Sequence, residues 1–185
     1  MEKKAGYEYL LAWKITVPIY DYTVTFCKTW RNLLSSNRTY DQMVQAARSG
    51  TQNVLEGNQQ DSLEGYIKLT GVNRGSLEEL LKDYLAFARQ NKIPIWPKGE
   101  AVRKIGKIRE IWEILKKTPT LPDNPNFPNF PDNLEEVVNL MITLVYQANF
   151  LQDRLKASLE KKFVEQGGFR ENLFKKRMEY KTKNS

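Results

Sequence analysis

Residue types that carry out catalysis are scarce in this sequence. No histidine is present among the 185 residues, which removes the commonest general base and the Glu-x-x-His pairs of di-iron helical bundles. Cys27 is the single cysteine and lies on an apolar helical stripe, so we expect it in the core. The adjacent carboxylates Glu78-Glu79 and Glu135-Glu136 face different sides of a helix, as solvated pairs do. We therefore predict no enzymatic activity, no metal site and no cofactor.

Basic residues carry the stronger chemical signal, because they are segregated along the chain. The formal net charge is +7, yet residues 89–117 alone carry +6 and residues 152–185 carry +5, which leaves about −4 for the remainder. Aromatic residues lie among these basic groups, and such mixtures are typical of surfaces that bind phosphates and stack bases. The interleaved aromatics are Trp96, Trp112, Phe169, Phe174 and Tyr180. The predicted nucleic-acid-binding residues are Arg103, Lys104, Lys107, Arg109, Arg170, Lys175, Lys176 and Arg177.

The same basic segments are compatible with surfaces of a different kind. Basic runs are in most proteins solvated faces, and a basic amphipathic helix can also lie on an anionic membrane. A protein-binding scaffold whose basic faces dock an acidic partner is the main alternative. Arg74 lies in an apolar register, where it either pairs with a glutamate such as Glu56 or Glu78 or contacts nucleic acid; we favour the structural pairing.

Hydrophobic periodicity predicts that helices position these side chains. The expected helices span residues 7–34, 40–56, 62–91, 99–117 and 134–165, with a kink or restart at Pro18. We expect Thr39 to cap the second helix, and Asp61 with Glu64 to form a capping box for the third. The predicted inward stripe of the first helix is Leu10, Trp13, Val17, Tyr20, Val24, Cys27 and Leu34; that of the 99–117 helix is Val102, Ile105, Ile108, Trp112 and Leu115.

Proline recurs at every third position from 119 to 131, which is the period of polyproline II. Such a segment forms a stiff strut of about 37 Å, long enough to return the chain along a helical bundle. The expected fold is all-α, an antiparallel up-and-down four-helix bundle with an extra short helix, this strut and a basic C-terminal extension. The bundle occupies residues 1–165 with an insertion at about 98–132, and residues 166–185 form the extension. No apolar run reaches the ~18 residues of a membrane span and no signal peptide is recognisable, so a cytoplasmic protein without membrane contact is expected.

Two stretches resemble a known family. Residues 38–57 (RTYDQMVQAARSGTQNVLEG) and 73–80 (NRGSLEEL) are similar to the four-helix-bundle proteins of ribosomal-RNA intervening sequences, whose relatives include accessory proteins of diversity-generating retroelements. Residues 165–171 (EQGGFRE) and the basic tail resemble a subgroup with a C-terminal suffix. Within these motifs we predict structural or interface roles for Arg48, Asn53, Glu56, Arg74 and Glu78.

The resemblance implies partners as well as a fold. It implies an up-and-down bundle that assembles as a homo-oligomer, a pentameric ring or barrel with basic surfaces. In the retroelement branch it also implies binding of nucleic acid, RNA or DNA, and of a reverse transcriptase. It implies no enzymatic activity. The small residues Ala46, Ala47 and Gly50 independently predict close helix approach within the bundle.

Overall fold

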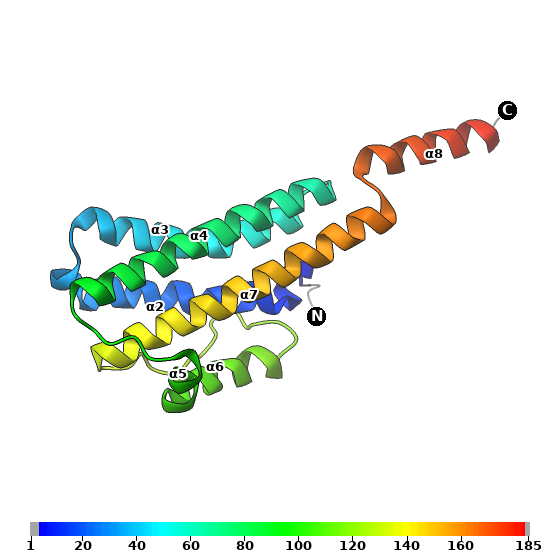
Figure 1. Cartoon of the computed structure of the whole chain (residues 1–185). Coiled ribbons are helices and arrows are strands. Elements are labelled where there is room, and N and C mark those ends of the chain that lie inside the picture. The colour runs from blue at the N-terminus through cyan, green and yellow to red at the C-terminus, as the bar shows by residue number, and fades with distance from the viewer. Residues whose placement is uncertain (1–3, 184–185) are drawn as a thin grey trace.

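The computed structural model describes residues 4–183, and within them every regular element is a helix (Figure 1). The all-α class predicted from the sequence is therefore confirmed. The α-helices are α1 (Leu11–Lys14), α2 (Thr16–Thr29), α3 (Asn37–Asn58), α4 (Leu63–Gln90), α5 (Lys98–Lys104), α6 (Gly106–Lys117), α7 (Leu134–Gln166) and α8 (Phe169–Lys183). Two short 3-10 helices, η1 (Gly6–Tyr9) and η2 (Arg31–Leu33), flank the first pair.

The long helices α2, α3, α4 and α7 form the body of the molecule, and each runs opposite to the long helix before it (Figure 1). Helix α3 packs against α2 and α4, and α7 packs against the same two helices. Fully buried side chains from all four fill the space between them, among them Phe26, Met43, Leu77, Tyr84 and Leu144. Gly50 of α3 allows close approach to α4, because a Cβ there would lie 2.9 Å from Leu77.

Serine residues cap the N-termini of α3 and α4. The Ser36 hydroxyl accepts a hydrogen bond from the Thr39 backbone N–H at 3.1 Å, and the Ser62 hydroxyl accepts one from Gly65 N–H at 3.0 Å. The predicted cap at Thr39 and the predicted capping box from Asp61 are therefore wrong. In each case a serine close by already supplies the acceptor for the third N–H of the helix.

The first predicted helix is divided. Helix α1 ends at Lys14, and α2 restarts at Thr16 with Pro18 in its first turn, where a missing N–H leaves no hydrogen bond unmade. The predicted inward stripe is confirmed only in part. Cys27 is fully buried, and four more of its members pack half-buried against the core: Trp13, Val17, Tyr20 and Leu34. The most deeply buried residues of this segment also include Ile15, Ile19, Tyr22 and Phe26, which the stripe left out. Helix α2 is covered on more than one side, so its apolar residues do not form a single stripe.

The predicted 99–117 helix is also two helices, which meet at the fully buried Ile105. Ala101, Ile108, Ile111 and Leu115 complete the buried face. Val102, assigned to this face from the sequence, is instead 43% exposed. The buried residues 101, 105, 108, 111 and 115 are separated by steps of three and four, so the buried face of α5 includes Ala101 in place of Val102.

The proline-rich segment bends at residues 118–120 and again at 123–124, so the prediction of one straight strut is wrong. Its second half follows α2. The Tyr22 hydroxyl donates to the Pro128 carbonyl at 2.6 Å, and the Phe130 ring lies 5.1 Å from that of Tyr22 and 5.9 Å from that of Trp30. The segment is thus held to the bundle by its aromatic residues and carbonyls.

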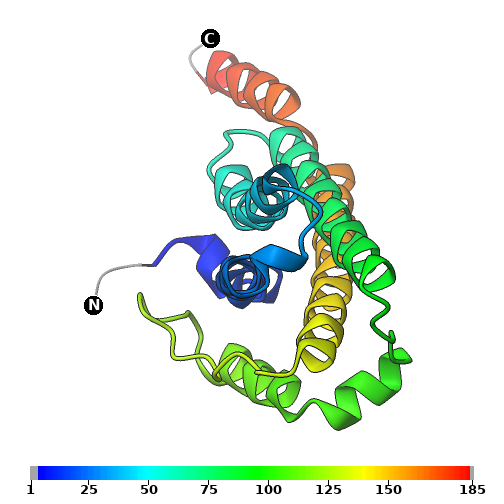
Figure 2. The same ribbon diagram turned by 90° about the vertical axis from the view of Figure 1, so that its left-hand side faces the viewer.

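The C-terminal extension is a helix, α8, which projects from the end of α7 away from the body (Figures 1 and 2). Gly167 ends α7, as the sequence predicted, and its φ of 76° is a conformation that glycine adopts without strain. Gly168 is buried against Glu64 and Phe163, and a Cβ there would meet both. The elbow between α7 and α8 therefore depends on both glycines.

Cys27 is fully buried beside Met43, as predicted from its place on the apolar stripe. Burial and the nearby charge of Asp83 raise the pKa of its thiol to about 12. The thiolate, which is the reactive form, is thereby suppressed at neutral pH. Cys27 is a packing residue of the core.

Lys14 joins the C-terminal end of α6 to the bundle. Its side chain is almost fully buried, and its Nζ donates to three carbonyl oxygens at the C-terminal end of α6: Leu115 at 2.6 Å, Thr118 at 2.9 Å and Pro119 at 3.2 Å. These carbonyls have no N–H partner within the helix, and the negative end of the helix dipole lies there. Burial lowers the pKa of Lys14, but the three oxygens favour its charged form.

We predict that Lys14→Met lowers the free energy of unfolding by about 2 to 3 kcal/mol, the usual worth of hydrogen bonds to a charged group in a buried site. Urea unfolding followed by circular dichroism measures this change. Lys28→Met is the matched control, because Lys28 is exposed on α2 and its loss should cost less than about 0.5 kcal/mol. Equal stability of the two variants would contradict the anchoring role of Lys14.

Candidate nucleic-acid interface

A hollow of about 460 Å³ lies where α5, α6 and α7 meet. Two of the predicted nucleic-acid-binding residues, Arg103 and Arg109, line it together with Trp112 and Gln147. Val102, Gly106 and Ile108 complete the lining. The bend at Ile105 brings the end of α5 and the start of α6 to the same hollow, so two arginines from different helices converge there.

A hydrogen bond across the hollow holds its aromatic wall. The Trp112 indole N–H donates to the Gln147 amide oxygen on α7 at 2.7 Å. Lys116 lies over the Trp112 ring, with its Nζ 5.5 Å from the ring centroid, and adds a cation–π contact. The half-buried indole therefore has one side occupied by the protein's own lysine.

The four basic residues predicted on α5 and α6 divide into two kinds. Lys104 pairs with Glu100 at 2.5 Å and lies 5.0 Å from the centre of the Trp96 ring. Lys107 donates to the Asn129 carbonyl and so fastens the proline-rich segment. Arg103 and Arg109 are exposed, and no carboxylate within residues 4–183 forms an ion pair with either. The two arginines are the residues of this set whose charge stays available.

Hydrogen bonds with α7 also fix the segment just before α5. Asn139 on α7 is 1% exposed; its amide oxygen accepts from Trp96 N–H at 2.7 Å, and its amide nitrogen donates to the Pro94 carbonyl at 2.9 Å. The Trp96 indole N–H donates to Glu135 at 2.5 Å. Trp96 is therefore a structural anchor as well as a surface aromatic.

The predicted residues of the C-terminal extension lie on α8, far from this hollow. Arg170, Lys175, Lys176 and Arg177 are all exposed. Figures 1 and 2 show α8 at one end of the molecule and α5 and α6 at the other. The structure therefore brings Arg103 and Arg109 together but keeps the two basic segments apart.

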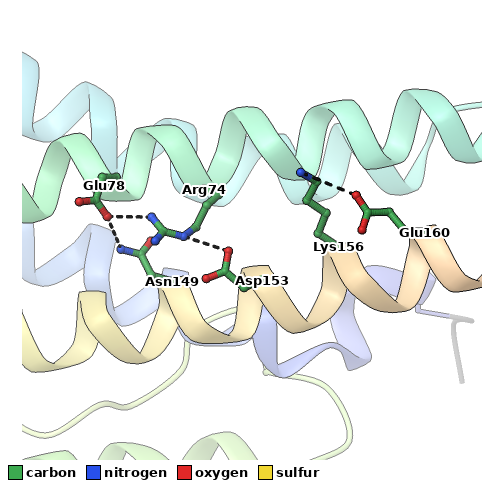
Figure 3. Close-up of polar contacts among 6 residues, drawn as sticks. All are labelled: Arg74, Glu78, Asn149, Asp153, Lys156 and Glu160. Carbon is green, nitrogen blue, oxygen red and sulfur yellow. Dashed lines mark hydrogen bonds and ion pairs between the residues drawn. The ribbon is translucent and has the colours of Figure 1, made fainter.

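Arg74 lies in a polar seam between α4 and α7 (Figure 3). Its Nη1 contacts Glu78 at 2.8 Å and its Nε contacts Asp153 at 3.1 Å, while Glu78 also accepts from the Asn149 amide at 3.3 Å. Partial burial opposes the guanidinium charge, but the two carboxylates outweigh it and raise the pKa of Arg74. Of the partners named from the sequence, Glu78 is the one in contact; Glu56 is exposed on α3 and is not in contact.

The other residues of the family-like motif have different surroundings. Asn53 is buried and donates to the Ser49 hydroxyl at 2.8 Å, which links to Ser76 of α4 at 2.9 Å. Arg48 and Glu56 are exposed on α3. Asn53 thus contributes to α3–α4 packing, whereas interface roles for Arg48 and Glu56 stay predictions.

Sequence reasoning missed the amides that position the site, Asn139 and Gln147. Both lie on α7, and the hydrophobic period of that helix identifies its apolar core positions but not these polar side chains. An amide in a long apolar run is a signal that a partner is needed, but the partner here comes from a segment with no fixed sequence spacing. The exposed aromatic residues Tyr146 and Phe150 of the same helix were also overlooked.

Residues 4–183 contain no group of three or more cysteine or acidic side chains placed to hold a metal ion. No helix among them combines the length and apolar character that crossing a bilayer requires. Comparison with protein-family models, with curated proteins and with solved structures finds no match to this chain.

Because the Arg74 seam is partly exposed, its ion pairs should stabilise the fold less than fully buried ion pairs do. Side chains of Arg74 and Asp153 are 32% and 60% exposed, so solvent screens their attraction. We predict that Arg74→Ala lowers the free energy of unfolding by about 1 kcal/mol, and that 1 M salt shrinks the difference. Lys156→Ala, which removes the more exposed pair with Glu160 at 3.7 Å, is the control and should cost less than about 0.5 kcal/mol. Breaking a buried ion pair usually costs ~3–5 kcal/mol, so a loss of that size in Arg74→Ala would contradict this prediction and show that water is excluded from the seam.

Proposed function

We propose that this chain is a non-enzymatic, oligomeric accessory protein of the cytoplasm that binds RNA or DNA. The observation that carries the proposal is the pair Arg103 and Arg109, which line one hollow with Trp112 and have no carboxylate partner within the described residues. Guanidinium groups bind phosphate oxygens in a bidentate manner, and an aromatic wall offers a base a stacking surface. Unpaired arginines around an aromatic hollow suit a nucleic-acid ligand.

The second basic surface, α8, adds to this proposal. It carries six basic and two acidic residues over Phe169–Lys183 and stands clear of the body. Because α8 and the arginine hollow lie at opposite ends, one nucleic acid that contacts both must cross the body or pass between two copies. Both arrangements favour an extended ligand over a small one.

Assembly and partner belong to the same proposal. The family resemblance supports a ring, with a pentamer as the specific form, and a reverse transcriptase as the protein partner. Exposed apolar side chains on α8 also favour contact with another polypeptide: Phe169, Leu173, Phe174 and Met178 are 46%, 50%, 65% and 47% exposed. An adjacent reverse-transcriptase gene would support the retroelement assignment.

The alternative function is a scaffold that docks an acidic protein on the same basic faces. The exposed aliphatic residues of α8, Leu173 and Met178, favour it, because they offer no flat ring on which a base could stack. A partner retained after nuclease treatment would support the scaffold, and loss of all partners on nuclease treatment would support nucleic-acid binding.

The binding test reverses the two available arginines. We predict that Arg103→Glu with Arg109→Glu weakens oligonucleotide binding at least about tenfold at low salt, since each missing charge-assisted hydrogen bond is worth about 1.5 kcal/mol or more. The slope of log affinity against log salt should shrink by roughly 0.7 to 0.9 for each phosphate that the variant no longer neutralises. Fluorescence anisotropy with a labelled oligonucleotide measures both quantities.

Lys68→Glu with Lys82→Glu is the matched control for that double variant. Both lysines are exposed on α4, and the change in net charge is the same. If the control weakens binding as much as the arginine variant, binding follows total charge and the hollow is not the site. Absence of binding by the natural chain at low salt would refute the function itself.

The assembly test is the mass in solution. We predict a species several times the 21.6 kDa chain mass in multi-angle light scattering. Phe174→Ser with Met178→Ser should reduce that mass if α8 supplies the contact, whereas Tyr9→Ser, at a 51% exposed residue of η1, should leave it unchanged. A strict monomer at tens of micromolar would contradict oligomerisation.

A further inference from the structure

Two large aromatic side chains lie exposed on α7, the helix that supplies Gln147 to the arginine hollow. Tyr146 is 41% exposed and Phe150 is 61% exposed. Tyr146 also lines a second hollow of about 310 Å³, shared with Ile95 and Trp96. Because Gln147, the next residue, lines the arginine hollow, the two hollows border neighbouring positions of α7.

The exposed residues continue along one side of α7. Tyr146, Phe150 and Arg154 are spaced by four residues, which places them on one face of the helix, and all three are exposed. No ion pair within residues 4–183 involves Arg154. The outer strip, defined as Tyr146, Phe150 and Arg154, thus has the cationic hollow beside its first ring and a cation at its far end.

The spacing of the rings fits unpaired bases. Residues four apart in a helix are separated by about 6 Å along its axis, whereas stacked bases of a duplex strand are separated by about 3.4 Å. Bases in a duplex also have their faces covered by their neighbours, so aromatic side chains bind bases that are unstacked. The flanking arginines would hold phosphates on either side.

We propose that the outer strip and the Arg103–Arg109 hollow together bind a single strand of nucleic acid, with bases on Tyr146 and Phe150 and phosphates on the arginines. This inference rests on the proposed function and names its ligand class. An acidic protein segment would satisfy the arginines equally well. The aromatic character of the exposed positions, with Trp96 and Trp112 in the adjoining hollows, favours bases, because every base offers a flat face for stacking.

The experiment measures binding of one labelled mixed-sequence oligonucleotide presented to the full chain as single-stranded RNA, single-stranded DNA and the DNA duplex. The natural chain should bind at least one single strand more tightly than the duplex, and the RNA and DNA arms identify which. Tyr146→Ala with Phe150→Ala should weaken single-strand binding about fivefold or more for each ring, with little change in the salt slope, because the rings neutralise no phosphate. Tyr146→Phe with Phe150→Tyr retains both rings and should bind as the natural chain does.

Three outcomes separate this inference from the proposed function. Tighter single-strand binding that disappears with the rings supports both. Duplex binding as tight as single-strand binding overturns the single-strand inference and leaves nucleic-acid binding standing. Affinity that Tyr146→Ala with Phe150→Ala leaves unchanged does the same, and this is the result expected if the outer strip binds a protein. Failure to bind any of the three probes overturns both. Tyr9→Ala controls for removal of an exposed ring elsewhere.

Discussion

The ammonium of Lys14 enters the space between the bundle and α6 and donates to the carbonyls of Leu115, Thr118 and Pro119. A buried lysine is costly unless its charge is well solvated by the protein, and the end of a helix supplies carbonyl oxygens that lack intrahelical partners. The carbonyl oxygens thus solvate the ammonium, and the ammonium supplies the hydrogen bonds that these oxygens lack. The position of α6 on the bundle depends on this contact, and with it the position of Arg109 and Trp112.

Further polar contacts complete the attachment of this layer, and each uses a side chain of α7 or a basic residue of α6. Asn139 holds residues 94 and 96, Gln147 holds Trp112, and Lys107 holds the proline-rich segment. The buried apolar face of α5 and α6 supplies the driving force for packing, whereas these directional bonds determine where the layer lies along α7. The arginine hollow is a consequence of that placement.

Basic residues in this chain have two separate tasks. Lys14, Lys104 and Lys107 are committed to carbonyls, to a carboxylate or to an aromatic ring of the chain itself. Arg103 and Arg109 have no ion-pair partner in the part of the chain that the structure describes. Net charge alone therefore overestimates the number of cations that a ligand could bind. An interface should be sought among the basic residues that have no partner within the chain.

Much of the architecture was determined by the sequence itself. The all-α class and the approximate spans of α3, α4 and α7 follow from local propensity and period, which depend on near neighbours. The burial of Cys27 and the helix stop at Gly167 were likewise readable from the chain. The position of α6 and the path of the proline-rich segment were decided by tertiary contacts, because Tyr22, Lys14 and Lys107 bind carbonyls far along the chain. The same holds for the site: the sequence singled out two basic segments, but only the folded structure separated the arginines that are available from the lysines that hold the fold together, since ion pairing depends on distances that sequence spacing does not contain.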